Sequence, residues 1–265
     1  MLKTNFHTHS TWCDGRNTPE EMILAAIEKG FGTLGFSSHM AFPFDDGCAM
    51  LPERSAEYVK EIRELARRYA GQLQVRCGGE ADYIPGATDP ARERYAFLKL
   101  DYLIGSIHQV VADDGGLVPV DHTPELLAEG VARHFGGDMR NYVETYFRQL
   151  RDMVTKFDFD VIGHPDLVRK FNLKHPGFDE SSAWYRRELE ETAEAIAASG
   201  KLVEVNTGAI SRGWLDDAYP SPGFRALLRA RGVKFILSSD AHAASALDCA
   251  FDRFAAAEDF VVPNF

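Results

Sequence analysis

Cysteine is scarce in this sequence, which has four such residues among 265. They are Cys13, Cys48, Cys77 and Cys249, and no two of them form a C-x-x-C pair. The scarcity excludes a disulfide-stabilised scaffold, and the spacing excludes a zinc site built from paired cysteines. We therefore predict a protein of the reducing cytoplasm.

Long apolar runs are also missing. No stretch approaches the roughly 20 consecutive apolar residues that cross a bilayer. The first residues reach a histidine motif at His7 without a basic and then apolar leader. We therefore expect no membrane partner and no export.

Positive charge is in deficit. The chain has 29 Lys and Arg against 40 Asp and Glu, and its net charge of -11 is spread along the sequence. This balance disfavours nucleic acid as a partner, unless a local basic groove overrides the overall field. A small anionic substrate would need local positive charge, which bound metal ions can supply.

No Gly/Ser/Pro-rich linker or low-complexity tract divides the chain, so we predict one domain spanning residues 1–265. With 45% hydrophobic residues, such a chain can bury one large core. A length near 250 residues is typical of a single α/β barrel.

Helical and extended patterns alternate along the chain. The first helix is marked by a capping box from Thr18 to Glu21, by Pro19 in its first turn and by Gly30 at its end. Helical periodicity also covers residues 53–70, 138–156 and 181–199 and the region after residue 221. Short apolar runs predict seven strands, at residues 3–6, 33–37, 74–78, 102–106, 159–162, 202–205 and 234–237.

Strands that alternate with helices are typical of parallel βαβ units. Closing seven such units on themselves gives an α/β barrel close to the TIM type, with one unit missing or distorted. The alternative is an open, doubly wound parallel sheet.

Side chains that bind metals follow six of the seven predicted strands. Residues two apart in an extended segment share a face, so His7 can converge with His9, and Asp240 with His242. The C-terminal strand ends of a parallel barrel form one rim, where we expect nine side chains to meet. They are His7, His9, Asp14, His39, Glu80, His108, His164, Asp240 and His242. We assign no metal to the other histidines, which are His122, His134 and His175.

Imidazole and carboxylate donors without thiolate suit zinc, iron or manganese. Nine protein ligands are too many for one ion, because zinc usually takes four. The sequence therefore predicts two or three divalent metal ions. Glu80 directly follows the small residues Gly78 and Gly79, and it is the candidate to bridge two ions.

These motifs resemble those of the polymerase and histidinol phosphatase (PHP) family, in particular its histidinol-phosphate phosphatase branch. The similarity runs from His7 to His242. Its segments are His7-Thr8-His9-Ser10, Cys13-Asp14-Gly15, Ser38-His39, Gly79-Glu80, Gly105-Ser106-Ile107-His108, Gly163-His164-Pro165-Asp166, Glu204-Val205-Asn206-Thr207 and Ser239-Asp240-Ala241-His242. The resemblance implies a distorted (β/α)7 TIM-like barrel of parallel strands with a trinuclear metal cluster. Some relatives have histidine at the position of Asp14, so the aspartate favours the monophosphatase branch.

The resemblance also implies how the ligands are divided among three ions. The first ion would be held by His7, His9, Glu80 and Asp240. Glu80 would bridge to a second ion, held by His108 and His164. The third would be held by Asp14, His39 and His242.

The activity implied is hydrolysis of a phosphomonoester, namely L-histidinol phosphate to histidinol and phosphate in histidine biosynthesis. The expected nucleophile is a hydroxide that bridges two metals at Glu80, because metal binding lowers the pKa of water. Asp240 and His242 would shape the cluster. We predict no phosphoenzyme intermediate.

Arginine can clamp a phosphate with two parallel hydrogen bonds, which lysine does less well. Arg169 is the first candidate for this role and Arg212 the second, whereas Lys170 is a weaker one. The substrate also carries a cationic amine, which suits acidic residues. The candidates to bind the amine are Asp45, Asp46 and Asp82.

Two other functions are compatible with the sequence. A PHP phosphoesterase acting on nucleotides or nucleic-acid ends is the closer alternative, although the acidic charge and the lack of a basic, aromatic-rich tract argue against a nuclease. A non-enzymatic metal-binding domain is less consistent, because structural metal sites are usually closed by few ligands.

Overall fold

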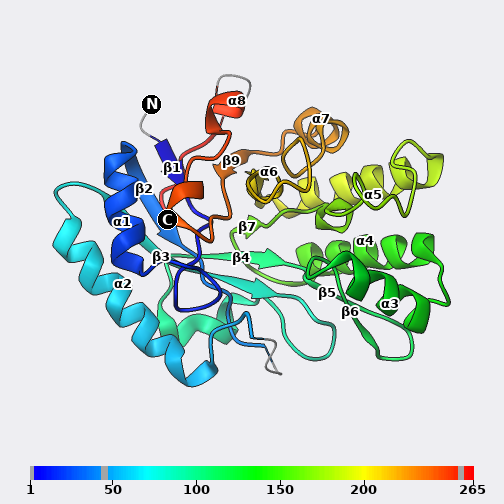
Figure 1. Cartoon of the computed structure of the whole chain (residues 1–265), viewed down its shortest axis with the longest axis horizontal. Helices are drawn as coiled ribbons and strands as arrows, with labels where there is room; N and C mark the ends of the chain where they lie inside the picture. The colour runs from blue at the N-terminus through cyan, green and yellow to red at the C-terminus, as the bar shows by residue number, and fades with distance from the viewer. Residues whose placement is uncertain (1–2, 43–46, 256–259) are drawn as a thin grey trace.

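The computed structural model describes residues 3–42, 47–255 and 260–265. Seven parallel strands pair in the order β1-β2-β3-β4-β7-β8-β9 and curve into a nearly closed barrel (Figure 1). Their bounds are Lys3–Asn5 (β1), Phe31–Phe36 (β2), Gln74–Asp82 (β3), Tyr102–Ser106 (β4), Val161–Ile162 (β7), Leu202–Asn206 (β8) and Phe235–Ser238 (β9). The predicted distorted (β/α)7 barrel is confirmed, and the open sheet is excluded.

The barrel closes where the first strand meets the last. Thr8, just beyond β1, pairs in parallel with Ala241, just beyond β9. The N–H of His9 donates to the carbonyl of Ala241 at 2.9 Å, and the N–H of Ala241 donates to the carbonyl of His7 at 3.4 Å. The two motifs at the ends of the sequence therefore form the seam of the barrel.

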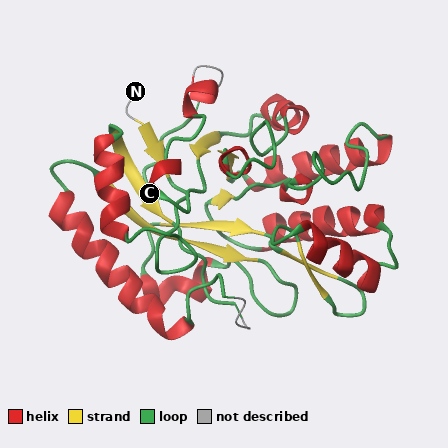
Figure 2. Cartoon of the chain, viewed as in Figure 1, coloured by secondary structure: helices red, strands yellow, loops and turns green. Residues whose placement is uncertain are grey.

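Helices flank the strands (Figure 2). They are α1 (Pro19–Glu28), α2 (Ser55–Tyr69), α3 (Pro124–His134), α4 (Met139–Lys156), α5 (Ala183–Ser199), α6 (Gly208–Ser211), α7 (Pro222–Ala230) and α8 (Phe251–Ala255). Short 3-10 helices cover Pro52–Arg54, Arg92–Leu98, Leu167–Arg169 and Ala244–Ala246. The predicted capping box of α1 is present, because Thr18 Oγ1 accepts from the N–H of Glu21, whose carboxylate accepts from the N–H of Thr18. Within the described residues, no helix combines the length and apolarity needed to span a bilayer.

Two features between β4 and β7 were not predicted. One is an antiparallel hairpin of β5 (Gln109–Val111) and β6 (Leu117–Pro119), whose strands are too short to show a period. The other is α3, which buries only Leu127 and Val131 and so has a weak apolar stripe. Its N-cap was nevertheless readable, because the Thr123 side chain accepts from the N–H of Leu126.

Strand β3 is longer than predicted. It continues through Glu80 to Asp82, so Glu80 lies within the strand rather than after it. Each residue from Gly78 to Asp82 pairs with a residue of β4. The glycines and alanine in this stretch make it a poor strand by propensity, and pairing with β4 overrides that preference.

The barrel interior below the rim is filled by Tyr102 of β4. Its hydroxyl lies 2.6 Å from the carbonyl oxygen of Phe6 and 3.1 Å from that of Phe36. A Cβ at Gly78 would come within 2.4 Å of the Tyr102 ring, so only glycine leaves room for it there. Phe265 stacks on the same ring at a centroid distance of 4.9 Å. This packing makes a rigid base for the polar rim above it.

Candidate metal centre

The structure brings all nine predicted ligand side chains together at the C-terminal rim. They form four overlapping groups whose ligand atoms lie within 4.8 Å of one another. The groups are His7–His9–Asp240, His7–Glu80–His164, His39–Glu80–His108 and His9–Asp14–His39–His242. Convergence of residues from β1 to β9 on one rim follows from the parallel, closed arrangement of the strands.

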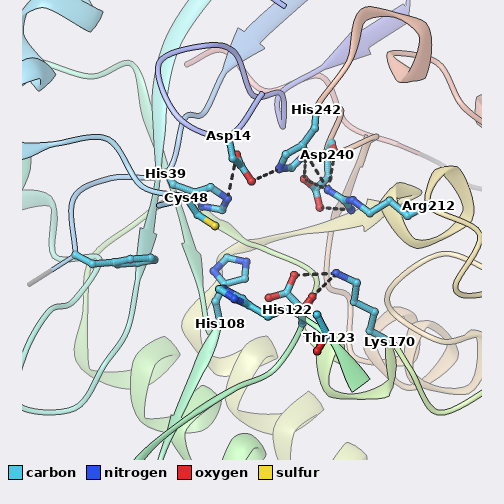
Figure 3. Close-up of a pocket in the computed structure, with 12 residues that line it drawn as sticks. Asp14, His39, Cys48, His108, His122, Thr123, Lys170, Arg212, Asp240 and His242 are labelled. Atoms are coloured by element: carbon cyan, nitrogen blue, oxygen red, sulfur yellow. Dashed lines mark hydrogen bonds and ion pairs between the residues drawn. The ribbon is translucent and has the colours of Figure 1, made fainter. Parts of the chain in front are cut away.

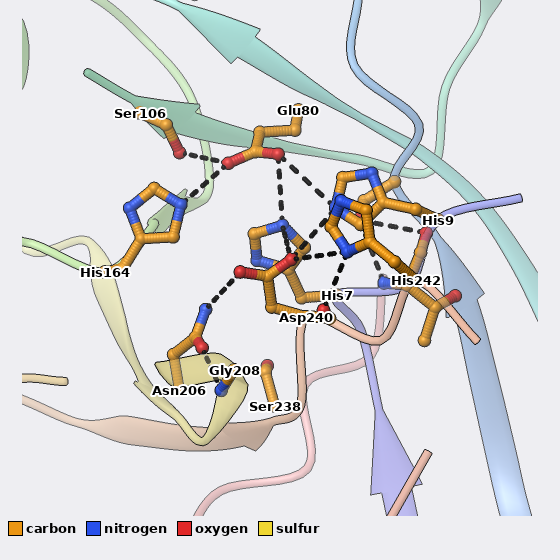
Figure 4. A network of polar contacts seen from close by, with 12 residues as sticks. His7, His9, Glu80, Ser106, His164, Asn206, Gly208, Ser238, Asp240 and His242 are labelled. Carbon is orange, nitrogen blue, oxygen red and sulfur yellow. Dashed lines mark hydrogen bonds and ion pairs between the residues drawn. The ribbon is translucent and has the colours of Figure 1, made fainter. Parts of the chain in front are cut away.

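Glu80 lies at the centre of these groups (Figure 4). Its Oε2 is 3.1 Å from His7 Nε2 and 3.0 Å from His39 Nδ1. Its Oε1 is 3.1 Å from His164 Nε2 and also accepts from the Ser106 hydroxyl at 2.6 Å. One carboxylate therefore faces several imidazoles, as a bridging ligand would.

Asp240 and His242 lie on the opposite side of the group, in the turn after β9. Asp240 Oδ1 is 3.2 Å from His9 Nε2, and His242 Nε2 is 3.1 Å from Asp14 Oδ2. Asp240 has a φ of 50°, a left-handed conformation that is unfavourable for a residue with a side chain. Such strained residues concentrate at functional sites.

Several of these atoms are buried without a hydrogen bond. They include His7 Nε2, His9 Nε2, His39 Nδ1 and Glu80 Oε2. A buried polar atom without a partner costs free energy, so such atoms are rare in native proteins. These atoms also belong to groups whose possible ligand atoms lie within 4.8 Å of one another, and the residues fit a metal site on that ground.

The charges in the group depend strongly on one another. Burial alone would raise the pKa of Glu80, but the imidazoles of His7, His39 and His108 outweigh it and hold that pKa well below its usual range. Burial and the neighbouring imidazoles of His242 and His39 lower the pKa of His9 to about 3. Glu80 is therefore an anion and His9 is neutral, which are the states that bind metals.

Two carboxylates contact the histidines on the side away from the pocket, a role that was predicted for neither. The carboxylate of Glu204 on β8 lies 2.9 Å from His7 Nδ1 and accepts a hydrogen bond from the backbone N–H of His164 at 2.8 Å. Asp82 on β3 receives both Nδ1 and the N–H of His108, at 2.9 Å and 2.8 Å. Glu204 is part of the Glu204-Val205-Asn206-Thr207 motif, and this motif was the sequence feature that could have pointed to its role.

The prediction that Asp82 binds a substrate amine is wrong. Its side chain is fully buried, and it is engaged with His108 below the rim. Asp45 and Asp46 lie outside the described residues. Among the described residues that line the open pocket, Asp121 is the acidic residue outside the nine proposed ligands, and it follows the β5–β6 hairpin.

An open pocket of about 320 Å³ lies above the ligand group (Figure 3). Its lining residues are Asp14, His39, Phe42, Cys48, His108, Asp121, His122, Thr123, Lys170, Arg212, Asp240 and His242. Side chains that can bind metals form one wall of the pocket, and residues 121–123 form part of another. His122, for which we predicted no role, therefore lies at the site. Its place could not be predicted without the β5–β6 hairpin that precedes it.

Two cations line this pocket. Lys170 donates to the carboxylate of Asp121 at 3.0 Å and to its backbone carbonyl at 2.8 Å. Arg212 Nη1 donates to Asp240 Oδ2 at 3.2 Å, and its Nη2 lies 2.8 Å from His242 Nδ1. Burial works against the charge of Arg212, but Asp240 outweighs it and raises the pKa of Arg212 above its usual value.

Arg169 is placed differently from its neighbour Lys170. It is not among the residues that line the pocket. Its Nε donates to Glu180 at 2.9 Å, while its buried Nη1 has no hydrogen-bond partner among the described residues. The role of Arg169 in phosphate binding stays a prediction.

The other unassigned histidines lie away from the rim. His134 Nδ1 is 3.0 Å from Asp114 Oδ2, and His175 packs near Trp214. Neither belongs to the groups of possible ligands.

Comparison with known proteins agrees with this geometry. A family model described as the PHP domain matches residues 5–208. The chain belongs to the PHP family. A protein of Deinococcus radiodurans described as a probable histidinol-phosphatase is 33% identical over 242 residues, which cover 89% of this chain and 85% of that protein.

Solved structures of PHP proteins have the same fold. The structure of HisK from Listeria monocytogenes has a TM-score of 0.83 and 20% identity, and covers 95% of this chain and 100% of that chain. The structure of histidinol phosphate phosphatase from Lactococcus lactis, complexed with zinc, L-histidinol and phosphate, has a TM-score of 0.63 and 23% identity. It covers 91% of this chain and 87% of that one.

Proposed function

We propose that this PHP protein is a metal-dependent phosphomonoester hydrolase that converts L-histidinol phosphate and water to histidinol and phosphate. The observation that carries the proposal is the convergence of nine side chains that can bind metals, seven of them buried, beside an open pocket that five of them line. A purely structural metal site would be closed by its ligands. The relatives described as histidinol-phosphatases support the choice of substrate.

The ligands divide among two or three divalent ions of zinc, iron or manganese. His7, His9, Glu80 and Asp240 would hold the first ion. Glu80, His108 and His164 would hold the second, and Asp14, His39 and His242 the third. Ions bound there would supply an activated water and would neutralise charge on the phosphoryl oxygens.

The chain itself would bind and orient the substrate. Arg212 is fixed by Asp240 beside the ligands, so it can hold a phosphoryl oxygen without losing much conformational freedom. Lys170 is held by Asp121 on the adjoining wall. The remaining capacity of the Asp121 carboxylate and the imidazole of His122 suit a substrate that carries both an amine and an imidazole.

Residues 1–265 would form one PHP-type domain, because the ligand set draws on strands from β1 to β9. Among the described residues Cys13, Cys77 and Cys249 form no disulfide, which supports a reducing, cytoplasmic setting. The described residues that line the pocket include more carboxylates (Asp14, Asp121 and Asp240) than Lys and Arg side chains (Lys170 and Arg212), which disfavours a basic track for nucleic acid, and the proposed partner is a small molecule.

The test is a substrate panel on protein reconstituted with zinc, iron or manganese. We expect kcat/KM for L-histidinol phosphate to exceed that for AMP by about tenfold or more, since specific contacts to amine and imidazole discriminate strongly. His164→Asn should abolish hydrolysis, whereas His134→Asn, which alters an imidazole outside the ligand group, should not. Failure to hydrolyse any phosphomonoester would refute an enzyme, and a clear preference for AMP would favour the nucleotide phosphoesterase.

A further inference from the structure

The histidines of the ligand group differ in what lies behind the ring. His7 and His108 each direct Nδ1 at a carboxylate that is not itself a proposed ligand. That contact keeps the proton on Nδ1 and leaves the Nε2 lone pair for a metal. Removing such a partner typically lowers metal affinity about 10- to 100-fold.

Glu204 has the larger structural role of the two carboxylates. Its side chain is 0% exposed, and besides His7 it binds the backbone N–H of His164 and the amide of Asn206, both at 2.8 Å. It therefore fixes one ligand proposed for the first ion and one proposed for the second. Asp82, also 0% exposed, fixes the ring and backbone of His108.

At the third position, His242 Nδ1 lies 3.4 Å from Asp240 Oδ1, but this carboxylate is itself a proposed ligand of the first ion. His242 Nδ1 lies 3.0 Å from the carbonyl oxygen of Asp240, which favours a proton on Nδ1. The same Nδ1 lies 2.8 Å from Arg212 Nη2, which can only donate and so favours the opposite tautomer. These two contacts compete, and the ring is not held in the form that leaves Nε2 free for a metal.

The other ligands of that position are also weakly supported. His39 Nδ1 faces Glu80, an oxygen donor that the first two ions would share. The side chains of Asp14 and His242 are 28% and 22% exposed, whereas those of His7 and Glu80 are 0% exposed. Water can reach the outer ligands and replace them, and the guanidinium of Arg212 beside His242 disfavours a further cation.

We propose that the three metal positions are unequal: Glu204 and Asp82 are positioning residues that retain the two inner ions, and the Asp14–His39–His242 position exchanges its ion first. This inference rests on the ligand assignment of the proposed function. It implies a long-lived state of the protein that has lost only the outer ion, so occupancy of the third position would follow the supply of metal.

The experiment loads the full chain with zinc and follows zinc release into a chelator, with zinc per chain measured by atomic emission. We expect two phases, of which the faster accounts for one ion of three. Asp14→Asn should remove the fast phase and leave the slow phase unchanged. Glu204→Gln and Asp82→Asn should each weaken zinc retention in the slow phase, with a loss of affinity of about 10- to 100-fold.

Asp114→Asn is the matched control, because Asp114 contacts His134 Nδ1 in the same way but away from the rim. It should leave both phases unchanged. Loss of all zinc in one phase, or a fast phase that persists in Asp14→Asn, would overturn the inference and leave the proposed function intact. Wild-type protein that retains no zinc, iron or manganese would instead overturn the ligand assignment itself. The wild-type release curve decides the matter even if Glu204→Gln does not fold.

Discussion

The imidazole of His108 is buried between two carboxylates. Burial alone would lower its pKa, but Asp82 and Glu80 outweigh burial and raise the pKa to about 9 in the metal-free protein. Below that pH the ring is protonated, and a metal can bind only after the proton leaves. His108 therefore links metal binding to proton release.

We expect wild-type protein to release a proton from His108 on binding zinc at pH 7. This contribution should fade as the pH rises through 9, because the metal-free ring is then already neutral. Asp82→Asn removes the carboxylate that raises the pKa most, so it should release fewer protons at pH 7. Calorimetric titration with zinc in buffers of different ionisation enthalpy measures the number. Equal proton release by the two proteins at pH 7 would contradict this role for Asp82.

Two adjacent basic residues, at the end of the 3-10 helix Leu167–Arg169, make a second test at this scale. Lys170 lines the pocket and Arg169 does not. We expect Lys170→Ala to raise KM for a phosphomonoester several-fold, because it removes a charge that faces the pocket. Arg169→Ala should act on kcat and KM only if the unpartnered Nη1 reaches the phosphate. Steady-state kinetics at full metal content compare the two, and unchanged kinetics for Arg169→Ala would end its candidacy.

At the scale of elements, the strands owe their positions to close packing around Tyr102. Gly78 of β3 lies against that ring, whereas a Cβ at Gly71, beyond α2, would meet nothing within 4 Å. A Gly→Ala change adds the same methyl group at both positions, so the two variants compare a packed site with an open one.

Gly78→Ala should lower the free energy of unfolding by about 1–3 kcal/mol, because an added methyl group overpacks a site that is already full. Gly71→Ala should change it by no more than about 0.5 kcal/mol. Urea denaturation followed by circular dichroism measures both. A Gly78→Ala protein as stable as the wild type would show that Tyr102 can move aside, and the rigid base of the rim would have to be reconsidered.

For the whole molecule, the side chains proposed to bind metal come from both ends of the barrel sequence. His7 and His9 follow the first strand and Asp240 lies in the turn after the last, across the seam formed by Thr8 and Ala241. An ion held by all three would tie the seam together. Metal that binds only the folded chain stabilises it by mass action.

Zinc should therefore raise the stability of the whole fold. Free zinc at 100 times Kd adds about 2.7 kcal/mol for one site, which raises Tm by roughly 5–10 °C for a chain of this size. Thermal unfolding with zinc, and again after a chelator, measures the shift. His164→Asn should show a smaller shift than His134→Asn, and an identical Tm with and without zinc in the wild type would argue against metal ligands drawn from opposite ends of the chain.

The sequence by itself determined the residue types at the rim and the order of the strands. The pairing of His7 with His9 was predictable because an extended chain alternates its side chains, which is a local property. Asp240 and His242 also converge, but Asp240 lies in a left-handed turn after β9 rather than in an extended segment. Strand and helix periods are local too, so the barrel and the convergence of the nine side chains were predictable. Strand ends such as that of β3 were not, because pairing with β4 decides where the strand stops.

Only the tertiary structure decided which side chains contact the proposed ligands and which side chains line the pocket. Asp82 was expected to face a substrate amine, yet the register of β3 turns it toward His108. Lys170 rather than Arg169 faces the pocket, because of the path that the chain takes after β7, and Asp121 reaches the pocket through the β5–β6 hairpin. These outcomes depend on contacts between distant residues, where a shift of one residue reverses the direction of a side chain.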